Sequence, residues 1–429
     1  MMVALKRRAV LTAIGAGLVG AAALAVRPRD KGAPHAEYFS RTSKALRAAG
    51  IATPTMVIDR DRLLANARQV MRNVDGRLPL RLVAKSLPCL PLLDLLMQTM
   101  QTRRLMVFNL PYLQQLAAQR GDVDLLLGKP LPAAAAAEFY RSFQGGQFNP
   151  RKQLQWLADT PERLAQYRDL AKAQQLDMRV SLEIDVGLHR GGVDSVQVLQ
   201  QMLAILKEEP RLQWSGMMGY DAHVSKLPLA SLREKALTHA KEIYRDYAGM
   251  ATQAMRPNGS LEGLVFNAGG SPTYRMHDSS GAANEVALGS ALVKPSDFDA
   301  DLLKDLAPAA FIATPVLKAG RHFQMPRGVE ALGDAARTWD VNQERVYFVY
   351  GGNWMADPVS PEGLAPSGLY GNSSNQQALL GSGTQQLQVD DFVFLRPRQS
   401  ESVLQQFGDI VVMEGGNVTV RWPVMPAMP

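Results

Sequence analysis

The sequence predicts an α/β protein, a (β/α)8 barrel of the TIM type followed by a smaller C-terminal β domain. First, eight short apolar runs alternate with helical patterns between residues 80 and 288, which is typical of a parallel sheet. Second, neither a Gly-X-Gly-X-X-Gly turn nor a P-loop follows the first run, so a closed barrel is favoured over an open nucleotide-binding sheet. Third, short β runs separated by Gly, Pro and Asn dominate after about residue 310. With 429 residues, the chain is long enough for both domains.

The first 26 residues resemble a twin-arginine export signal. Lys6-Arg7-Arg8 precedes an uncharged stretch from Ala9 to Val26, and Ala23-Leu24-Ala25 offers a small-residue cleavage site. The same 18 residues lie at the lower edge of what spans a bilayer, so an uncleaved anchor is the alternative. Either way we expect a bacterial protein delivered by the export machinery, periplasmic or anchored facing the periplasm.

The charge of the chain gives no indication of nucleic-acid binding, and its cysteine content excludes an internal disulfide. The formal net charge of +7 falls to +4 when the three basic residues of the leader are removed, and no basic block indicates nucleic-acid binding. The single Cys89 cannot form an internal disulfide and is expected to be a buried apolar residue.

The elements can be assigned in chain order. Residues 27–52 are an N-terminal extension with a short amphipathic helix over 41–49, ended by Gly50. The barrel domain covers 53–309. It opens with a strand at 55–59, which is also a candidate member of the β domain, and a helix from about 60 to 71. Thr160 and Pro161 mark the clearest helix start, as N-cap and first helical residue. The expected barrel strands are 80–85, 105–108, 123–127, 156–158, 179–184, 216–219, 264–266 and 286–288.

The β domain covers residues 310–429. Its segment 357–383 is rich in Gly, Pro, Ser, Asn and Gln, and this composition predicts a long loop that is functional or disordered. The expected strands are 311–316, 345–350, 391–395, 410–413 and 418–422.

Lys85 follows the first barrel strand. Residues at the carboxyl ends of barrel strands face the active site, so a lysine there is displayed to a ligand. A desolvated lysine can become a nucleophilic amine, which predicts a Schiff-base lysine. The alternative is an ordinary surface lysine.

Two glycine-containing segments follow the seventh and eighth strands, where barrels bind phosphate. They are 267–274 and Gly289-Ser290-Ala291. Glycines let backbone N–H groups approach phosphate oxygens closely, and the hydroxyls of Ser271, Thr273 and Ser290 can add hydrogen bonds. The alternative is a pair of ordinary turns.

Ionisable residues also follow the fifth and sixth strands. Arg190 could lie beside a cofactor ring, where a guanidinium would keep a pyridine nitrogen unprotonated, or could form a structural ion pair with Glu183 or Asp185. Tyr220 and His223 are candidate acids or bases, although a lone loop histidine is often an ordinary polar residue.

In order and spacing, these segments resemble the fold-type III pyridoxal-phosphate (PLP) enzymes, the alanine racemase barrel class, and within it the D-threonine aldolase and D-serine dehydratase-like family. The resemblance spans most of the chain after the leader, and no segment is specific alone. The matching segments are 53–59, the Lys85 strand, 183–193, 220–223, 269–274, 285–290 and 415–423.

The resemblance implies a site for pyridoxal 5'-phosphate. Lys85 would hold its aldehyde carbon as a Schiff base, and Arg190 would pair with the pyridine nitrogen, with Tyr220 nearby. The substrate would be a small amino acid of D configuration, and relatives of this type commonly pair as homodimers. The residues expected around the phosphate are Gly269, Gly270, Ser271, Thr273, Tyr274, Gly289 and Ser290.

The chain departs from this family where the family binds a metal. Gln399 stands where a histidine is expected and Glu401 where a thiolate or carboxylate is expected, while the loop that normally carries Glu-His-Gly contains Gln376 and Gln377. No histidine follows His322. We therefore assign no metal ligand and expect these four residues to be substrate-pocket groups. A weak site for a hard cation at Gln399 and Glu401 is the alternative.

Three functions remain open from the sequence. A lyase of the aldolase or dehydratase type would handle the substrate's β-oxygen with Glu401 or His223. A racemase would use Tyr220 or His223 as an acid on the opposite face of the cofactor. A catalytically impaired PLP-binding or amino-acid-binding protein of the cell envelope is the third.

Overall fold

The computed structural model describes residues 27–256, 258–369 and 373–426, so the predicted leader lies outside the described residues. Within these ranges, no helix is both long and apolar enough to cross a membrane. The chain divides into two compact units. One joins the residues up to Thr55 to Ile312–Arg396, and the other joins Met56–Phe311 to the residues from Pro397 onward.

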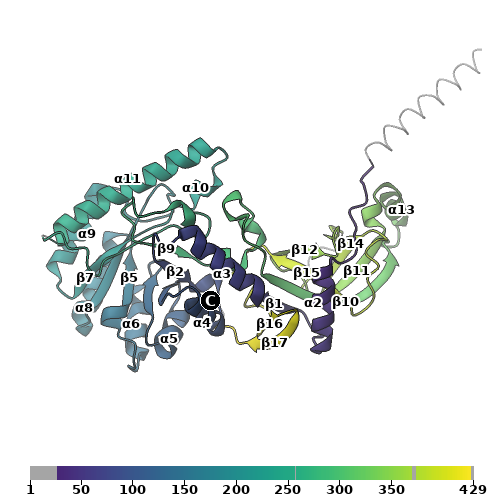
Figure 1. The fold of residues 1–429 in the computed structure, drawn as a ribbon, viewed down its shortest axis with the longest axis horizontal. Coiled ribbons are helices and arrows are strands. Elements are labelled where there is room, and N and C mark those ends of the chain that lie inside the picture. The colour runs from purple at the N-terminus through teal and green to yellow at the C-terminus, as the bar shows by residue number, and fades with distance from the viewer. Residues whose placement is uncertain (1–26, 257, 370–372, 427–429) are drawn as a thin grey trace, which may run out of the picture. The chain divides into compact units, whose positions relative to one another are not determined.

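The second of these units, the barrel unit, contains the predicted closed parallel barrel (Figure 1). The last strand pairs with the first through Leu80 opposite Val286 and Leu82 opposite Leu288, so the sheet has no open edge. This confirms the expected fold class. The barrel strands are β2 (Leu80–Val83), β3 (Arg104–Val107), β4 (Asp124–Leu127), β5 (Leu154–Ala158), β6 (Met178–Ile184), β7 (Leu212–Gly219), β8 (Val265–Ala268) and β9 (Glu285–Leu288).

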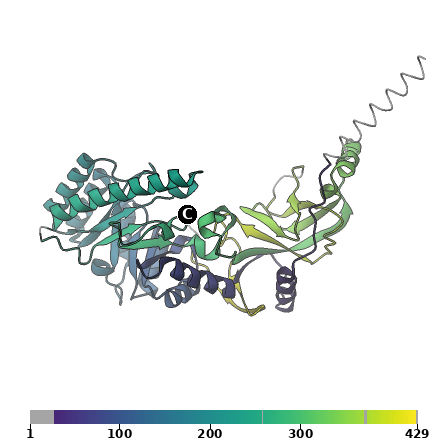
Figure 2. The same cartoon turned by 45° about the horizontal axis from the view of Figure 1, so that its top comes forward.

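Helices connect successive strands, and side-chain caps fix where several of them begin. Thr160 caps α8 by accepting the backbone N–H of Arg163, as predicted, and Asn109 caps α5 in the same way. The longest helix, α11, is the long teal helix of Figure 2. The barrel-unit helices are α3 (Arg60–Val74), α4 (Leu90–Thr99), α5 (Leu110–Gln119), α6 (Ala133–Ser142), α7 (Pro150–Gln153), α8 (Pro161–Gln174), α9 (Val196–Glu208), α10 (His223–Lys226), α11 (Ala230–Met255) and α12 (Ser290–Val293).

The interior of the barrel holds an ion network, formed by Arg81, Arg104, Asp124, Arg179 and Glu285. Arg81 is fully buried and donates from Nε to Glu285 at 2.5 Å and from a terminal nitrogen to Asp124 at 2.6 Å. Arg104 donates to the other oxygen of Glu285 at 3.1 Å. A buried arginine is tolerated only when its hydrogen-bonding groups are satisfied, so this network fixes the relative positions of β2, β3, β4 and β9.

Three further strands belong to the barrel unit. β16 (Ile410–Glu414) pairs in parallel with β1 (Thr55–Asp59) and antiparallel with β17 (Asn417–Trp422). The backbone N–H of Met425 donates to the carbonyl of Pro88, which attaches the C-terminal segment beside α4. Cys89 is buried as expected, and desolvation raises the pKa of its thiol to about 12.

The other unit is mostly an antiparallel sheet, as predicted. β14 pairs with β11 over six residues, and Ala378 and Leu380 pack against Phe323 and Val346. The prediction of a long loop over 357–383 was wrong, because the apolar run after Gln377 completes this sheet despite its polar flanks. The elements are α2 (Glu37–Ala48), β10 (Ala310–His322), which starts in the barrel unit, α13 (Glu330–Trp339), β11 (Arg345–Tyr350), β12 (Ala356–Ser360), β13 (Ala365–Pro366), β14 (Gln376–Gly381) and β15 (Phe392–Pro397).

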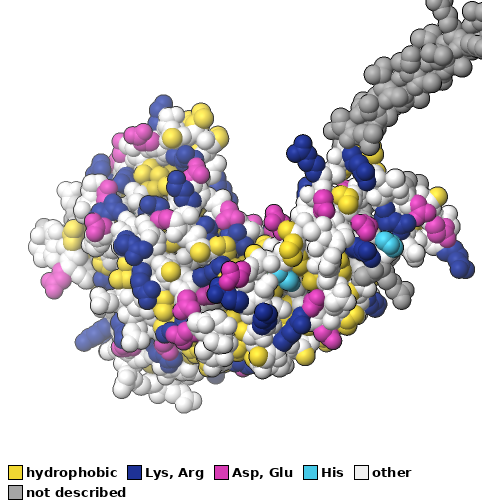
Figure 3. Space-filling model, turned by 45° about the vertical axis from the view of Figure 1, so that its right-hand side comes forward, with side chains coloured by type: hydrophobic (Ala, Val, Ile, Leu, Met, Phe, Trp, Pro, Cys, Tyr) yellow, Lys and Arg dark blue, Asp and Glu magenta, His cyan; other side chains and the backbone are white. Residues whose placement is uncertain are grey.

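On the face drawn in Figure 3, acidic and basic side chains are interspersed. This arrangement agrees with the small net charge that remains after the leader. Mixed charge of this kind gives no large field of one sign at that face.

Candidate active site

A cavity of about 370 Å³ lies in the barrel unit, lined by residues at and after the carboxyl ends of the barrel strands. This is the end of a barrel at which active sites occur. Many of the predicted site residues line it, and they come from six separate segments of the chain. These are Lys85, Arg190, Tyr220, Gly269, Gly270, Ser271, Gly289, Ser290 and Glu401.

Lys85 lies in a single 3-10 turn, Ala84–Ser86, directly after β2. Its Nζ is 4.5 Å from the centroid of the Phe108 ring and 3.7 Å from Oε1 of Glu401. The side chain is 33% exposed, so it is partly withdrawn from solvent. The ammonium therefore faces an aromatic ring and a carboxylate at the cavity wall.

Three serines surround the carboxylate of Glu401 and form, with it, the serine–glutamate cluster: Ser86, Ser290, Ser400 and Glu401. Ser86 donates to Oε1 at 2.8 Å, and Ser400 donates to Oε2 at 3.1 Å. The hydroxyl of Ser290 lies 3.0 Å from that of Ser86 and 3.1 Å from that of Ser400. Both carboxylate oxygens are thus held by hydroxyl groups, which fixes Glu401 beside Lys85.

Ser86 and Ser400 were missed by reasoning from the sequence. Each adjoins a residue that was singled out, Lys85 or Glu401, but a serine beside a charged residue is common and carries no spacing signal. Only the fold brings the two serines together, because they are separated by more than three hundred residues.

Arg190 and Tyr220 form a second wall of the cavity. The guanidinium carbon of Arg190 is 4.7 Å from the centroid of the Tyr220 ring. No ion pair within the described ranges joins Arg190 to Glu183 or Asp185, and Asp185 instead contacts His189 at 2.8 Å. Burial raises the pKa of the Tyr220 phenol, so Tyr220 keeps its proton at neutral pH.

Glu183 lines the same cavity from β6. Desolvation, together with the nearby negative charge of Asp159, raises the pKa of its carboxyl to about 7, although Arg190 acts in the opposite direction. Perturbed carboxyl groups of this kind occur often in functional sites. From the sequence, Glu183 was expected only as an ion-pair partner for Arg190, because the burial of one residue at a strand end cannot be inferred from its type.

The two glycine segments meet at Ser271. Its Oγ accepts the backbone N–H groups of Gly289 at 3.1 Å and Ala291 at 3.0 Å. A Cβ on Gly270 would lie 2.5 Å from the Tyr220 ring, and one on Gly289 would lie 2.9 Å from both Ser86 and Val83. Glycine is therefore required at both positions, and the backbone is left accessible from the cavity.

Thr273 and Tyr274 do not line the cavity, and their hydroxyls are bonded elsewhere. Thr273 donates to Asp221 at 2.6 Å, and Asp221 also contacts Nε2 of His277 at 2.6 Å. The Tyr274 hydroxyl lies 2.7 Å from the amide nitrogen of Asn73. These bonds support the 269–274 loop from behind.

Asp221 and His277 are buried, and both were missed from the sequence because 56 positions separate them. Burial alone would raise the pKa of the Asp221 carboxyl, but the hydrogen bonds from His277 and Thr273 outweigh burial and lower it. Asp221 is therefore a charged anchor for the loop at neutral pH.

The remaining predicted residues also lie outside the cavity lining. His223 begins α10, with a buried Nδ1 that has no hydrogen-bond partner among the described residues, and its Nε2 faces Gly187. Gln399 is exposed and donates to Asp297 at 3.1 Å. Gln376 and Gln377 lie on β14 in the other unit, where Gln376 accepts a hydrogen bond from Lys318 at 3.0 Å. In the part of the chain that is described, no three His, Cys, Asp or Glu side chains gather to hold a metal ion.

Comparison with known proteins identifies the family. The model of the alanine racemase N-terminal domain matches residues 58–297, more than half of the chain. No curated protein sequence matches the chain.

Solved structures of three kinds share the fold. The D-threonine aldolase from Filomicrobium marinum superposes with a TM-score of 0.66 at 16% identity, covering 87% of this chain and 97% of its own. D-threo-3-hydroxyaspartate dehydratase from Delftia sp. HT23 gives 0.62 at 19% identity, with 87% and 97% covered. An alanine racemase from Bacillus anthracis gives 0.62 at 13% identity, with 87% and 98% covered. The chain therefore belongs to the alanine racemase N-terminal domain family, the barrel family of the fold-type III PLP enzymes, which include lyases and racemases.

Proposed function

We propose that this protein is a PLP-dependent lyase acting on a small amino acid, of the D-threonine aldolase or D-serine dehydratase type, and that it does not use the usual metal. The observation that carries the proposal is the amine of Lys85 at the cavity wall, 3.7 Å from a carboxylate held by two serine hydroxyls. The D configuration of the substrate is inferred from the family resemblance.

The residues of the cavity fit PLP. Lys85 would attach it covalently, Arg190 would lie at the ring nitrogen, and the backbone N–H groups of residues 269–271 and of Ser290 would take the phosphate. Gly270 and Gly289 both line the cavity without a side chain that covers their backbone, and this supports the fit because an anion can approach the backbone from the cavity. When bound, the cofactor withdraws electrons from the substrate's Cα.

The chain's own residues would move the protons. Glu401 lies beside the Lys85 amine, and Ser86 and Ser400 fix its carboxylate, so a proton can pass between the two groups. As a free amine, Lys85 would take a proton from the substrate. Glu401, at the position where the family resemblance expects a metal ligand, would take or return the proton at the substrate's β-oxygen.

Racemisation is the second candidate, and Tyr220 favours it. Tyr220 lines the cavity and keeps its proton at neutral pH, so it can act as an acid toward Cα. His223 is not supported in this role, because it does not line the cavity. A cofactor-binding protein without turnover remains as a third outcome of the experiment below.

We also propose an envelope location, because the leader resembles a twin-arginine signal, and a homodimer, because relatives commonly pair. A reporter fused after residue 52 should reach the periplasm, and Lys6, Arg7 and Arg8 should be required for it. Sedimentation of the purified protein should give twice the chain mass.

The experiment starts with cofactor binding. Purified protein with added PLP should show a yellow absorbance band that borohydride bleaches. A protein that stays colourless would contradict every hypothesis in which PLP is bound. The holoprotein is then assayed with D-threonine, D-serine and both enantiomers of alanine, with divalent cations and with a chelator. A lyase releases acetaldehyde from D-threonine or pyruvate from D-serine, a racemase interconverts the alanines, and an inert binder does neither. Activity that survives chelation supports the metal-free proposal, and activity restored only by a cation contradicts it.

A further inference from the structure

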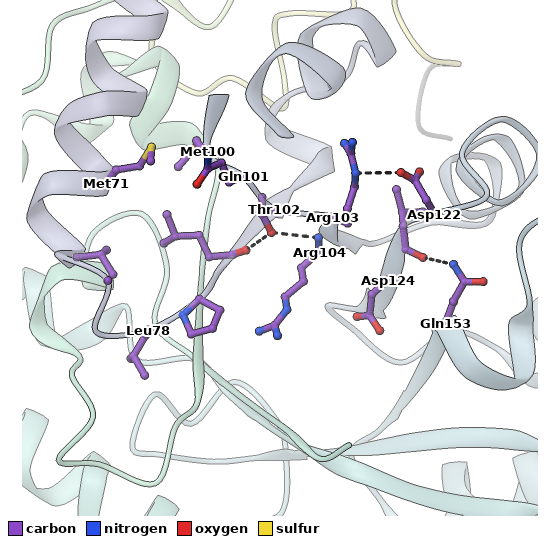
Figure 4. A pocket seen from close by; sticks show the side chains of 15 residues that line it. Met71, Leu78, Met100, Gln101, Thr102, Arg103, Arg104, Asp122, Asp124 and Gln153 are labelled. Atoms are coloured by element: carbon purple, nitrogen blue, oxygen red, sulfur yellow. Dashed lines mark hydrogen bonds and ion pairs between the residues drawn. The ribbon is translucent and has the colours of Figure 1, made fainter. Parts of the chain in front are cut away.

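A second pocket, the basal pocket, lies at the opposite end of the barrel. It has a volume of about 480 Å³ and is lined by the first residues of β2, β3 and β4 together with the end of α3. Figure 4 shows Arg104 extending between the apolar side, where Leu78 lies, and the Asp124 carboxylate. Met71 and Met100 complete the apolar side. The pocket therefore combines a hydrocarbon wall with a polar one.

The ion network beside this pocket carries one excess positive charge. Three guanidinium groups, those of Arg81, Arg104 and Arg179, face two carboxylates, those of Asp124 and Glu285. Asp124 lies 2.6 Å from Arg81 and 3.8 Å from Arg179, so its charge is already shared by two cations. The neighbouring Arg103 and Asp122 pair with each other at 2.9 Å and leave the balance unchanged.

The excess charge is accessible at Arg104. Arg81 is fully buried and donates hydrogen bonds from all three of its nitrogens. Arg104 makes a single side-chain hydrogen bond among the described residues, to Glu285, and its side chain is 40% exposed. A guanidinium has five N–H groups in a fixed fork, so most of those of Arg104 are open to the pocket.

Two other polar groups of the pocket, the side chains of Gln153 and Thr102, are already bonded. The amide of Gln153 donates to the carbonyls of Gly121 and Val123, both at 2.8 Å. The hydroxyl of Thr102 donates to the carbonyl of Leu80 at 2.6 Å. Of the two arginines that line the pocket, Arg103 has its charge paired with Asp122, so Arg104 is the donor with unbalanced charge that a ligand would meet.

We propose that the basal pocket binds a small organic monoanion, a carboxylate joined to an apolar group. The carboxylate would accept two parallel hydrogen bonds from Arg104, the geometry that arginine and carboxylate groups prefer. The hydrocarbon part would pack against Leu78, Met71 and Met100, and methionine side chains adapt readily to such a ligand. The network has a single excess positive charge, so a second negative group would find no cation to balance it, which disfavours dicarboxylates and phosphate. The pocket has the volume of an ordinary small-molecule site.

This site would be separate from the site at Lys85. The test is calorimetric titration of the holoprotein with isovalerate, with isovaleramide as the neutral analogue and succinate as the dianion. We expect isovalerate to bind, and the other two to bind at least about tenfold more weakly. No binding of isovalerate, or equal binding of the amide, would overturn the proposal.

Three variants locate the ligand. Arg104→Gln should weaken isovalerate binding at least about tenfold, whereas Arg103→Gln, whose charge is already paired, should change it less than about twofold. Met71→Glu, which leaves the ion network intact, should weaken binding as strongly as Arg104→Gln and keeps the test valid if Arg104→Gln fails to fold. Arg190→Gln should leave binding unchanged. A loss in Arg190→Gln with full binding in Arg104→Gln would place the ligand in the other cavity and refute the basal site.

Discussion

The interior of the barrel and its carboxyl-terminal mouth both contain a cation beside a carboxylate, but the two pairs differ in burial and in distance. Inside, Arg81 is fully buried and lies 2.5 Å from Glu285 and 2.6 Å from Asp124. At the mouth, Lys85 is 33% exposed and lies 3.7 Å from Glu401. Arg81, which donates from all three of its nitrogens, holds strands in place, while a loosely paired amine can exchange one partner for another. The proposed chemistry lies at the mouth, while the interior pairs make the barrel rigid.

The largest effect should come from Lys85→Ala. The variant should lose the borohydride-sensitive band and all measurable turnover, because no other amine at this strand end can replace it. Its melting temperature should stay within a few degrees of the parent protein. Lys129→Ala is the matched control, since Lys129 also lines the cavity, and it should keep the band. A band that survives in Lys85→Ala would mean that another lysine carries the cofactor.

A charge deletion in the interior should instead reduce stability. Glu285→Gln leaves Arg81 buried without its closest carboxylate, and loss of one partner of a buried ion pair typically costs about 3–5 kcal/mol. The free energy of unfolding, measured in urea, should fall by that amount. Glu138→Gln breaks an exposed pair with Arg141 and should cost less than about 1 kcal/mol. Equal effects of the two changes would show that the interior ion network contributes no more to stability than an exposed ion pair.

Glu401→Gln should separate catalysis from cofactor binding. The amide keeps the shape of the carboxylate but cannot accept a proton, so turnover should fall about 100-fold while the affinity for PLP changes little. Gln399→Ala is the control, because Gln399 is exposed and bonds Asp297. Full activity in Glu401→Gln would show that this carboxylate is incidental to the reaction.

The smallest effect concerns the protonation of Glu183 in the protein without cofactor. Its pKa rises from an ordinary 4.5 to about 7, so the folded state binds this proton more tightly than the unfolded state. The corresponding stability is fully present below about pH 4.5 and is lost as the pH rises through 7. We expect a loss of about 1–2 kcal/mol, allowing for solvent screening at the mouth. Glu183→Gln should remove this part of the pH dependence, and an unchanged profile would contradict the assignment.

The barrel was predictable because parallel strands covered by helices are apolar on both sides. That pattern located all eight strands, and the rule that ligands bind at strand ends then placed Lys85 at the cavity. The start of α8 was predictable for a local reason, since Thr160 and Pro161 act within one turn.

The missed features depend on contacts between distant parts of the chain. Arg81 lies in an otherwise apolar strand, and only the closed barrel shows that it points inward to Glu285. The same holds for Asp221 with His277, and for Ser400 beside Glu401. β14 was missed because its polar start resembles a loop, while its pairing with β11 lies outside any local window.

One carboxylate of the interior belongs to both ends of the barrel. Oε1 of Glu285 accepts a hydrogen bond from Asn267, which lines the mouth, and Oε2 accepts one from Arg104, which lines the basal pocket. The two compartments are therefore connected through the hydrogen bonds of a single carboxylate. By thermodynamic linkage, any change that a basal anion makes to cofactor affinity must be returned in equal measure by the cofactor to the anion.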